Sequence, residues 1–175
     1  MSLWRRLFRR SRPLRVDDYG ELAGATLRDE QLVELTGEIE ALESIVDPIA
    51  GGRFVVLEYG AWPQSTTPGI DGASPTASSA FQLTCHQATD FVLVKGGKRL
   101  LIRVDRGRDV GELHGELIDR YGLSLRAEAH GIRGGDRVRV LGAIERLAAV
   151  GSPMRGDPYL AVIAAQRIWP LVADV

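Results

Sequence analysis

Histidine, cysteine and acidic side chains are the first candidates for chemistry in this 175-residue chain. Cys85 and His86 are neighbours, and successive side chains of a strand point to opposite faces, so we do not expect a nucleophile–base pair. His114 lies two residues from Glu116, which is not the spacing of a metal-binding pair, and His130 stands alone. The pattern predicts no catalytic residue, no metal site and no cofactor, and we expect a protein that is not an enzyme.

The remaining candidates for chemistry have structural interpretations. Cys85 is the only cysteine, which excludes an intrachain disulfide, a RING-type zinc site and a thiolate cluster. Phe81, Leu83 and Cys85 are spaced two residues apart, so on a strand their side chains point to the same face, which predicts that Cys85 lies in the core. Residues 131–135 lack the Lys-Ser/Thr ending of a phosphate-binding loop. Four acidic residues are interpreted as a solvated strand face: Glu34, Glu38, Glu40 and Glu43.

The N-terminal residues MSLWRRLFRR carry the strongest functional signal. On a helical wheel their large apolar side chains take one side and their arginines the other. The first fifteen residues hold six arginines and no acid, which leaves a net charge of −7 on the rest of the chain. We predict a basic amphipathic arm over residues 1–15 that docks on an anionic membrane surface or on a partner protein. Its docking residues are Leu3, Trp4, Arg5, Arg6, Leu7, Phe8, Arg9 and Arg10.

Other interpretations of the arm stay open. The apolar stripe could dock on the chain's own β domain, or the segment could be a targeting peptide or disordered. Residues 16–30 have weak periodicity and are predicted to be a linker with a short helix.

Period-two alternation begins after residue 31 and predicts a β domain over residues 31–175. Strands are expected over residues 33–41 and 54–62, in the stretch FQLTCHQ, and as a pair within 90–106 around a tight Gly-Gly turn. Twelve of the seventeen residues 63–79 are Pro, Gly, Ser or Thr, which predicts a flexible loop.

One helix interrupts the strands. Val110, Leu113 and Leu117 fall on one helical stripe, and Asp109 is a plausible N-cap with Glu112 completing a capping box. Gly122 stands where a glycine ends a helix. The pattern predicts an inserted α-helix over residues 109–121, followed by further strands. The turn Gly134-Gly135-Asp136 introduces one of them.

Two decapeptides share a broken strand pattern, VELTGEIEAL at 33–42 and VRVLGAIERL at 138–147. Glycine lets a strand bend sharply without crowding its neighbour, so we interpret Gly37 and Gly142 as corners on two long strands in different sheets of one barrel. The alternative is coincidence. We expect a mainly β fold, a small OB-like antiparallel barrel, closed or partly open, with one inserted helix and an N-terminal amphipathic helix.

Three stretches resemble the GIDE domain, also called the beside-a-membrane domain. They are VELTGEIEALESIVDPIAGGRFVVLEY (33–59), FVLVKGGKRLLIRV (91–104) and GIRGGDRVRVLGAIE (131–145). The resemblance implies an OB-like barrel lying against a membrane. The best known members are membrane-anchored mitochondrial ubiquitin ligases. This sequence shows neither their transmembrane helices nor a RING finger, so ligase activity is not carried over, and attachment would depend on the arginine arm.

We therefore expect a non-enzymatic β-barrel adaptor or binding module, docked peripherally at a membrane or in a membrane-linked complex. A protein partner would contact edge strands of the barrel. No apolar run reaches the length of a membrane span and no secretory leader is recognisable, so we expect a cytoplasmic protein, peripheral at the inner face of the membrane when the arm binds lipid.

The alternative is a single-stranded nucleic-acid-binding module. The absence of an aromatic residue from the basic stretch and the acidic body both disfavour it. The identity of the partner, the cellular process and the oligomeric state are not encoded in recognisable motifs. The candidate anion or nucleic-acid contacts are Lys95, Lys98, Arg99 and Arg103.

Overall fold

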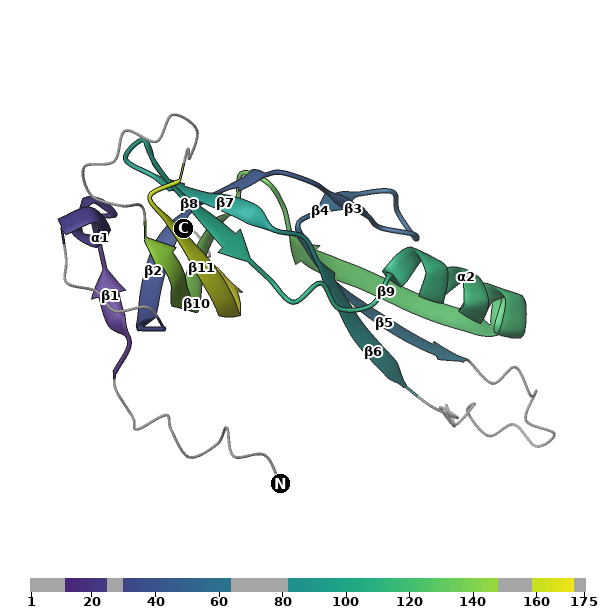
Figure 1. Cartoon of the computed structure of the whole chain (residues 1–175). Coiled ribbons are helices and arrows are strands. Elements are labelled where there is room, and N and C mark those ends of the chain that lie inside the picture. Colours follow the sequence, from purple (N-terminus) through teal and green to yellow (C-terminus); the bar gives the residue numbers. More distant parts are fainter. Residues whose placement is uncertain (1–11, 25–29, 64–81, 148–158, 172–175) are drawn as a thin grey trace, which may run out of the picture. The chain divides into compact units, whose positions relative to one another are not determined.

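The computed structural model describes residues 12–24, 30–63, 82–147 and 159–171 (Figure 1). The chain divides into two compact units. Unit 1 comprises the described residues of Met1–Leu42, Asp90–Val104 and Gly134–Val175, and unit 2 comprises those of Glu43–Thr89 and Asp105–Arg133. Two long insertions into the first unit build a sheet of their own, within the residues 31–175 that the sequence predicts as one β domain.

Unit 1 contains a six-stranded sheet. Its strands are β1 (Leu14–Val16), β2 (Leu32–Ala41), β7 (Phe91–Lys95), β8 (Lys98–Arg103), β10 (Arg137–Leu147) and β11 (Ala161–Pro170). The order is β1-β2-β10-β11-β8-β7, and β2 also pairs with β7, so five of the strands are linked in a ring. Neighbours in the ring are antiparallel except β8 and β11, which are parallel, and β1 pairs in parallel with β2. The mainly β prediction is confirmed.

The period-two pattern supplies the core of unit 1. Val33 and Leu35 of β2 are fully buried, while Glu34 between them is only partly buried and points to the other face. Gly96 and Gly97 both have positive φ, as a two-residue type I′ hairpin turn requires, and the predicted turn between β7 and β8 is confirmed.

Gly37 and Gly142 lie in neighbouring strands of one sheet. Gly37 pairs with Val138, and Gly142 pairs with Val33, so the prediction that they belong to different sheets is wrong. The two similar decapeptides are antiparallel partners. A Cβ on Gly37 would lie 2.5 Å from the Tyr19 hydroxyl oxygen, and one on Gly142 would lie 2.6 Å from the Ala164 carbonyl oxygen. Glycine is therefore required by close approach.

The described first part of the predicted linker, residues 16–24, is packed into unit 1. Val16, Tyr19 and Leu22 are buried, and a short helix, α1 (Gly20–Gly24), is present as expected. Residues 14 and 15, expected in the arm, instead belong to β1. The amphipathic helix and its docking residues 3–10 lie outside the described residues.

Unit 2 contains a three-stranded antiparallel sheet in the order β6-β5-β9, a small hairpin and one long helix. Its elements are β3 (Ile45–Val46), β4 (Arg53–Phe54), β5 (Val56–Pro63), β6 (Leu83–Ala88), α2 (Val110–Tyr121), a 3-10 turn (Gly122–Ser124) and β9 (Leu125–Ile132). The strand expected over 54–62 is divided at Val55, whose N–H donates to the Ile132 carbonyl oxygen at 2.7 Å. Residues 64–79 of the predicted loop lie outside the described residues.

Helix α2 has the boundaries that its sequence predicts. The Asp109 carboxylate accepts a hydrogen bond from the Glu112 N–H at 2.9 Å, which caps the helix, and Gly122 ends it with φ of 54°. Its apolar stripe belongs to the same core as Leu57 and Tyr59 of β5. The helix therefore covers one face of the three-stranded sheet and leaves the other face without helical cover in unit 2.

Candidate functional site

The four basic residues predicted to contact anions all lie on the β7–β8 hairpin of unit 1. Each of them has a polar partner within that unit. Because three of these partners are carboxylates, the hairpin presents much less positive charge than its sequence suggests. The pairs are Lys95 with the Thr36 hydroxyl at 3.1 Å, Lys98 with Asp18 at 2.6 Å, Arg99 with Glu40, and Arg103 with Glu145 at 3.2 Å.

The partner of Lys98 shows the electrostatic effect of this pairing. The hydrogen bond from the Lys98 ammonium group, together with one from the Gly20 N–H, holds the pKa of Asp18 below its ordinary value. Arg99 also lies over the ring of Tyr159, with its guanidinium carbon 5.6 Å from the ring centroid. A polyanion would have to compete with these contacts.

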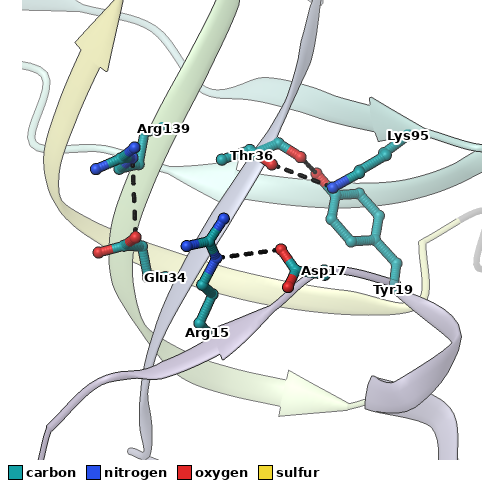
Figure 2. A network of polar contacts seen from close by, with 7 residues as sticks. All are labelled: Arg15, Asp17, Tyr19, Glu34, Thr36, Lys95 and Arg139. Atoms are coloured by element: carbon teal, nitrogen blue, oxygen red, sulfur yellow. Dashed lines mark hydrogen bonds and ion pairs between the residues drawn. The ribbon is translucent and has the colours of Figure 1, made fainter. Parts of the chain in front are cut away.

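A polar network crosses β1, β2, β7 and β10 on unit 1 (Figure 2). Thr36 is its centre: its carbonyl oxygen accepts from the Tyr19 hydroxyl at 2.9 Å, and its hydroxyl accepts from Lys95. Arg139 of β10, which pairs with Thr36, forms a diagonal ion pair with Glu34 of β2 at 3.8 Å. Tyr19 could not be singled out from the sequence, because the segment around it has neither strand nor helix periodicity.

A hollow of about 500 Å³ lies beside this network. Its lining includes Glu38, Glu40, Lys95 and Arg137, and two glycine-containing turns contribute Gly96 and Gly135. The lining carries both signs of charge, which suits a polypeptide segment with mixed side chains better than a nucleic-acid strand.

The open face of the unit 2 sheet gathers polar side chains. His86, Glu58 and His130 form one row across β6, β5 and β9, and the His130 Nε2 lies 3.1 Å from a Glu58 oxygen. His130, expected to stand alone, therefore has a partner. The row borders a hollow of about 370 Å³ over Gly60. Within the four described ranges, no group of three or more His, Cys, Asp or Glu side chains is placed to hold a metal ion.

Two further candidates lie on the helix-covered side of the same sheet: Cys85 of β6 and His114 of α2. Cys85 is partly buried against the unit 2 core, and burial raises the pKa of its thiol although Arg108 acts in the opposite direction. His86 is exposed on the other face, as expected from strand alternation. The Tyr59 hydroxyl lies 2.7 Å from Nδ1 of His114, and burial, with a smaller effect of Cys85, raises the pKa of Tyr59.

The β3–β4 hairpin exposes two large apolar side chains. Val46 is 53% exposed and Ile49 is 45% exposed, although Ile45 and Phe54 anchor the hairpin in the unit 2 core. Asp47 is buried, and its carboxylate accepts from the Ile49 N–H at 2.8 Å while its backbone bonds to Gly51 and Gly52. Apolar side chains held in a fixed turn are typical of a protein-contact surface.

No protein-family model matches the chain, and no curated protein is detectably similar to it. Among the residues that the structure describes, no helix has the length and apolar character needed to span a membrane.

Proposed function

We propose that this chain is a non-enzymatic protein-binding module, docked by its basic arm at a membrane or in a membrane-linked complex. In this proposal the five-strand ring of unit 1 is a closed OB-like barrel of the GIDE type. The strand connectivity supports the barrel: pairing returns to β2, and the parallel contact between β8 and β11 joins the otherwise antiparallel strands.

The β3–β4 hairpin carries the protein-binding proposal. A turn that is fixed by a buried carboxylate and yet exposes Val46 and Ile49 loses little conformational entropy when a partner covers it. Edge strand β6 supplies a second contact over Leu83–Cys85, since β5 is its strand neighbour and, among the described residues, 106–108 bond to its outer edge only from His86 to Ala88.

The nucleic-acid alternative is disfavoured by the hairpin of unit 1. Its cations bond to Asp18, Glu40, Glu145 and Thr36, and any phosphate must displace these partners. We expect fluorescence anisotropy with a labelled single-stranded oligonucleotide to show no binding at physiological salt. Salt-sensitive binding that is lost with Lys98→Ala would favour the alternative instead.

Flotation with anionic vesicles tests the docking step. The full chain should float with phosphatidylglycerol-containing vesicles and not with phosphatidylcholine vesicles, because arginines near an anionic surface each contribute about 1 kcal/mol. The truncated chain must begin at Arg12 so that β1 is kept intact. Equal flotation of both chains would remove the membrane-docking part of the proposal.

The matched control for flotation keeps every arginine and replaces Leu3, Trp4, Leu7 and Phe8 with serine. We expect this variant to float less than the full chain and more than the truncated one. Its arginines are still attracted to the anionic lipid, but no apolar side chains of the arm insert into the membrane.

Binding through the hairpin is tested by comparing Val46→Asp/Ile49→Asp with the unchanged chain in affinity purification. A partner that the unchanged chain retains should be lost by the variant, whereas Ile118→Asp, the same kind of change at an exposed apolar residue of α2, should retain it. A partner that both variants retain would place the contact elsewhere.

A further inference from the structure

The outer edge of β9 is the longest regular strand edge in unit 2. β9 pairs with β5 without a register shift over eight residue pairs, from Leu125 with Pro63 to Ile132 with Val56. Among the described residues no strand pairs with its other edge. The opposite edge of the sheet differs, because residues 106–108 bond to β6: the Ala88 N–H donates to Arg106 and the Arg108 N–H donates to His86.

β9 lacks three of the devices that commonly block edge pairing. The strand contains no proline, no lysine and no bulge, although natural edge strands are commonly protected by these features. Its residues alternate between two faces. Arg126, Glu128 and His130 are exposed, whereas Leu125, Ala127 and Ala129 lie on the side of the unit 2 core.

We infer that β9 pairs with β9 of a second copy of this chain, antiparallel and with Ala127 on the two-fold axis. In this register Arg126 lies opposite Glu128 of the second copy, and the symmetry makes this contact twice. Leu125 lies opposite Ala129, so apolar side chains also meet across the interface. The result is a continuous six-stranded sheet built from two identical halves.

Neighbouring registers are less favourable. Centring the axis on Glu128 places its two copies directly opposite each other, and like charges in that position are destabilising. Centring it on Ala129 places Arg126 opposite Ile132. Of these three registers, only the one centred on Ala127 pairs opposite charges on one face and apolar residues on the other. This self-complementarity favours a second copy of the chain as the partner of this edge.

Sedimentation equilibrium of the full chain over micromolar concentrations tests the inference. The unchanged chain should form dimers, and Arg126→Glu should weaken dimerisation at least about tenfold because two attractions become two repulsions. The double variant Arg126→Glu/Glu128→Arg should restore the affinity to within about threefold. Arg167→Glu, which makes the same charge change on an exposed residue of unit 1, should have no effect.

Three outcomes would overturn the inference: a chain that stays monomeric throughout, a dimer that Arg126→Glu leaves unchanged, or a double variant that stays as weak as the single one. Circular dichroism confirms that each variant is folded before its mass is interpreted.

Disulfide crosslinking tests the register independently. With Cys85→Ser removing the only native thiol, Ala127→Cys should form a disulfide dimer on oxidation, because residues on the axis have Cα atoms about 5 Å apart. Ala129→Cys should not, since its two copies would lie about 14 Å apart along antiparallel strands. Efficient crosslinking through Ala129→Cys instead would contradict the Ala127 axis.

Discussion

Residue-level packing in unit 1 depends on the two strand glycines. At Gly37 the space of a missing Cβ is taken by the Tyr19 hydroxyl, the Val94 carbonyl and the Leu93 side chain. At Gly142 backbone from β11 approaches as closely, and the β10–β11 register shifts at this position. Backbone atoms cannot rotate away as a flexible side chain can, so any larger residue must displace a strand.

Gly142→Ala should therefore destabilise the protein by about 1–3 kcal/mol, the usual cost of overpacking. Chemical denaturation followed by circular dichroism measures this difference. Gly115→Ala is the control, because a Cβ there meets no atom within 4 Å, and this helical position should gain up to about 1 kcal/mol. An unchanged midpoint for Gly142→Ala would contradict the close approach of β11.

Tyr19 ties the segment before β2 to the sheet and adds a dependence on high pH. Burial raises the pKa of Tyr19, so the folded phenol stays neutral while the unfolded phenol ionises near pH 10. Because the folded pKa is raised, its contribution to stability is complete below about pH 10 and is lost as the pH rises further.

Tyr19→Phe should cost about 1 kcal/mol at neutral pH, because the hydrogen bond to the Thr36 carbonyl oxygen is lost. The variant should also lose less stability than the unchanged chain between about pH 8 and about pH 11. Urea unfolding at both pH values measures the two effects. If both proteins lose the same amount of stability between these pH values, ionisation of Tyr19 is not the cause of the loss at high pH.

Elements with strong local signals were predictable, and elements defined by distant contacts were not. The cap at Asp109, the stripe from Val110 and the C-terminal Gly122 define α2 without reference to the rest of the chain. The period-two pattern predicted β2 and β10 in the same way. By contrast, β1 is too short to show a period, and Tyr59 and His114 meet only because α2 and β5 contribute to the same unit 2 core.

Asp109→Ala should destabilise unit 2 by about 1 kcal/mol, because the Glu112 N–H loses its acceptor at the start of α2. Hydrogen exchange of the helix amides measures the change. Asp119→Ala, in the last turn of the same helix, should be neutral or slightly stabilising, since an acid there opposes the helix dipole. Equal effects of the two substitutions would argue against the cap.

Whole-molecule organisation depends on pairings between distant parts of the sequence. Val33 pairs with Gly142, and Leu100 pairs with Ala161, so unit 1 needs all three of its chain segments. Local periodicity cannot indicate that the segments between them build a separate sheet, which is why the division into two units was missed from the sequence.

Removing the chain from Tyr159 onward should prevent unit 1 from folding, because β10 and β8 would both lose their shared neighbour β11. We expect loss of cooperative unfolding and aggregation, measured by denaturation and light scattering. A chain ending at Leu171 keeps β11 whole and is the control. A cooperative transition of normal midpoint in the shorter chain would show that the ring is not required.

The position of β11 in the ring also has a consequence for synthesis on the ribosome. The residues of unit 2 have all been made once Arg133 is added, and this unit has every strand it needs at that stage. The other unit must hold β2, β7 and β8 with unfilled edges until residue 170 has left the exit tunnel. The nascent polypeptide thus passes through a half-finished stage in which aggregation-prone edges need protection by a chaperone or by rapid completion.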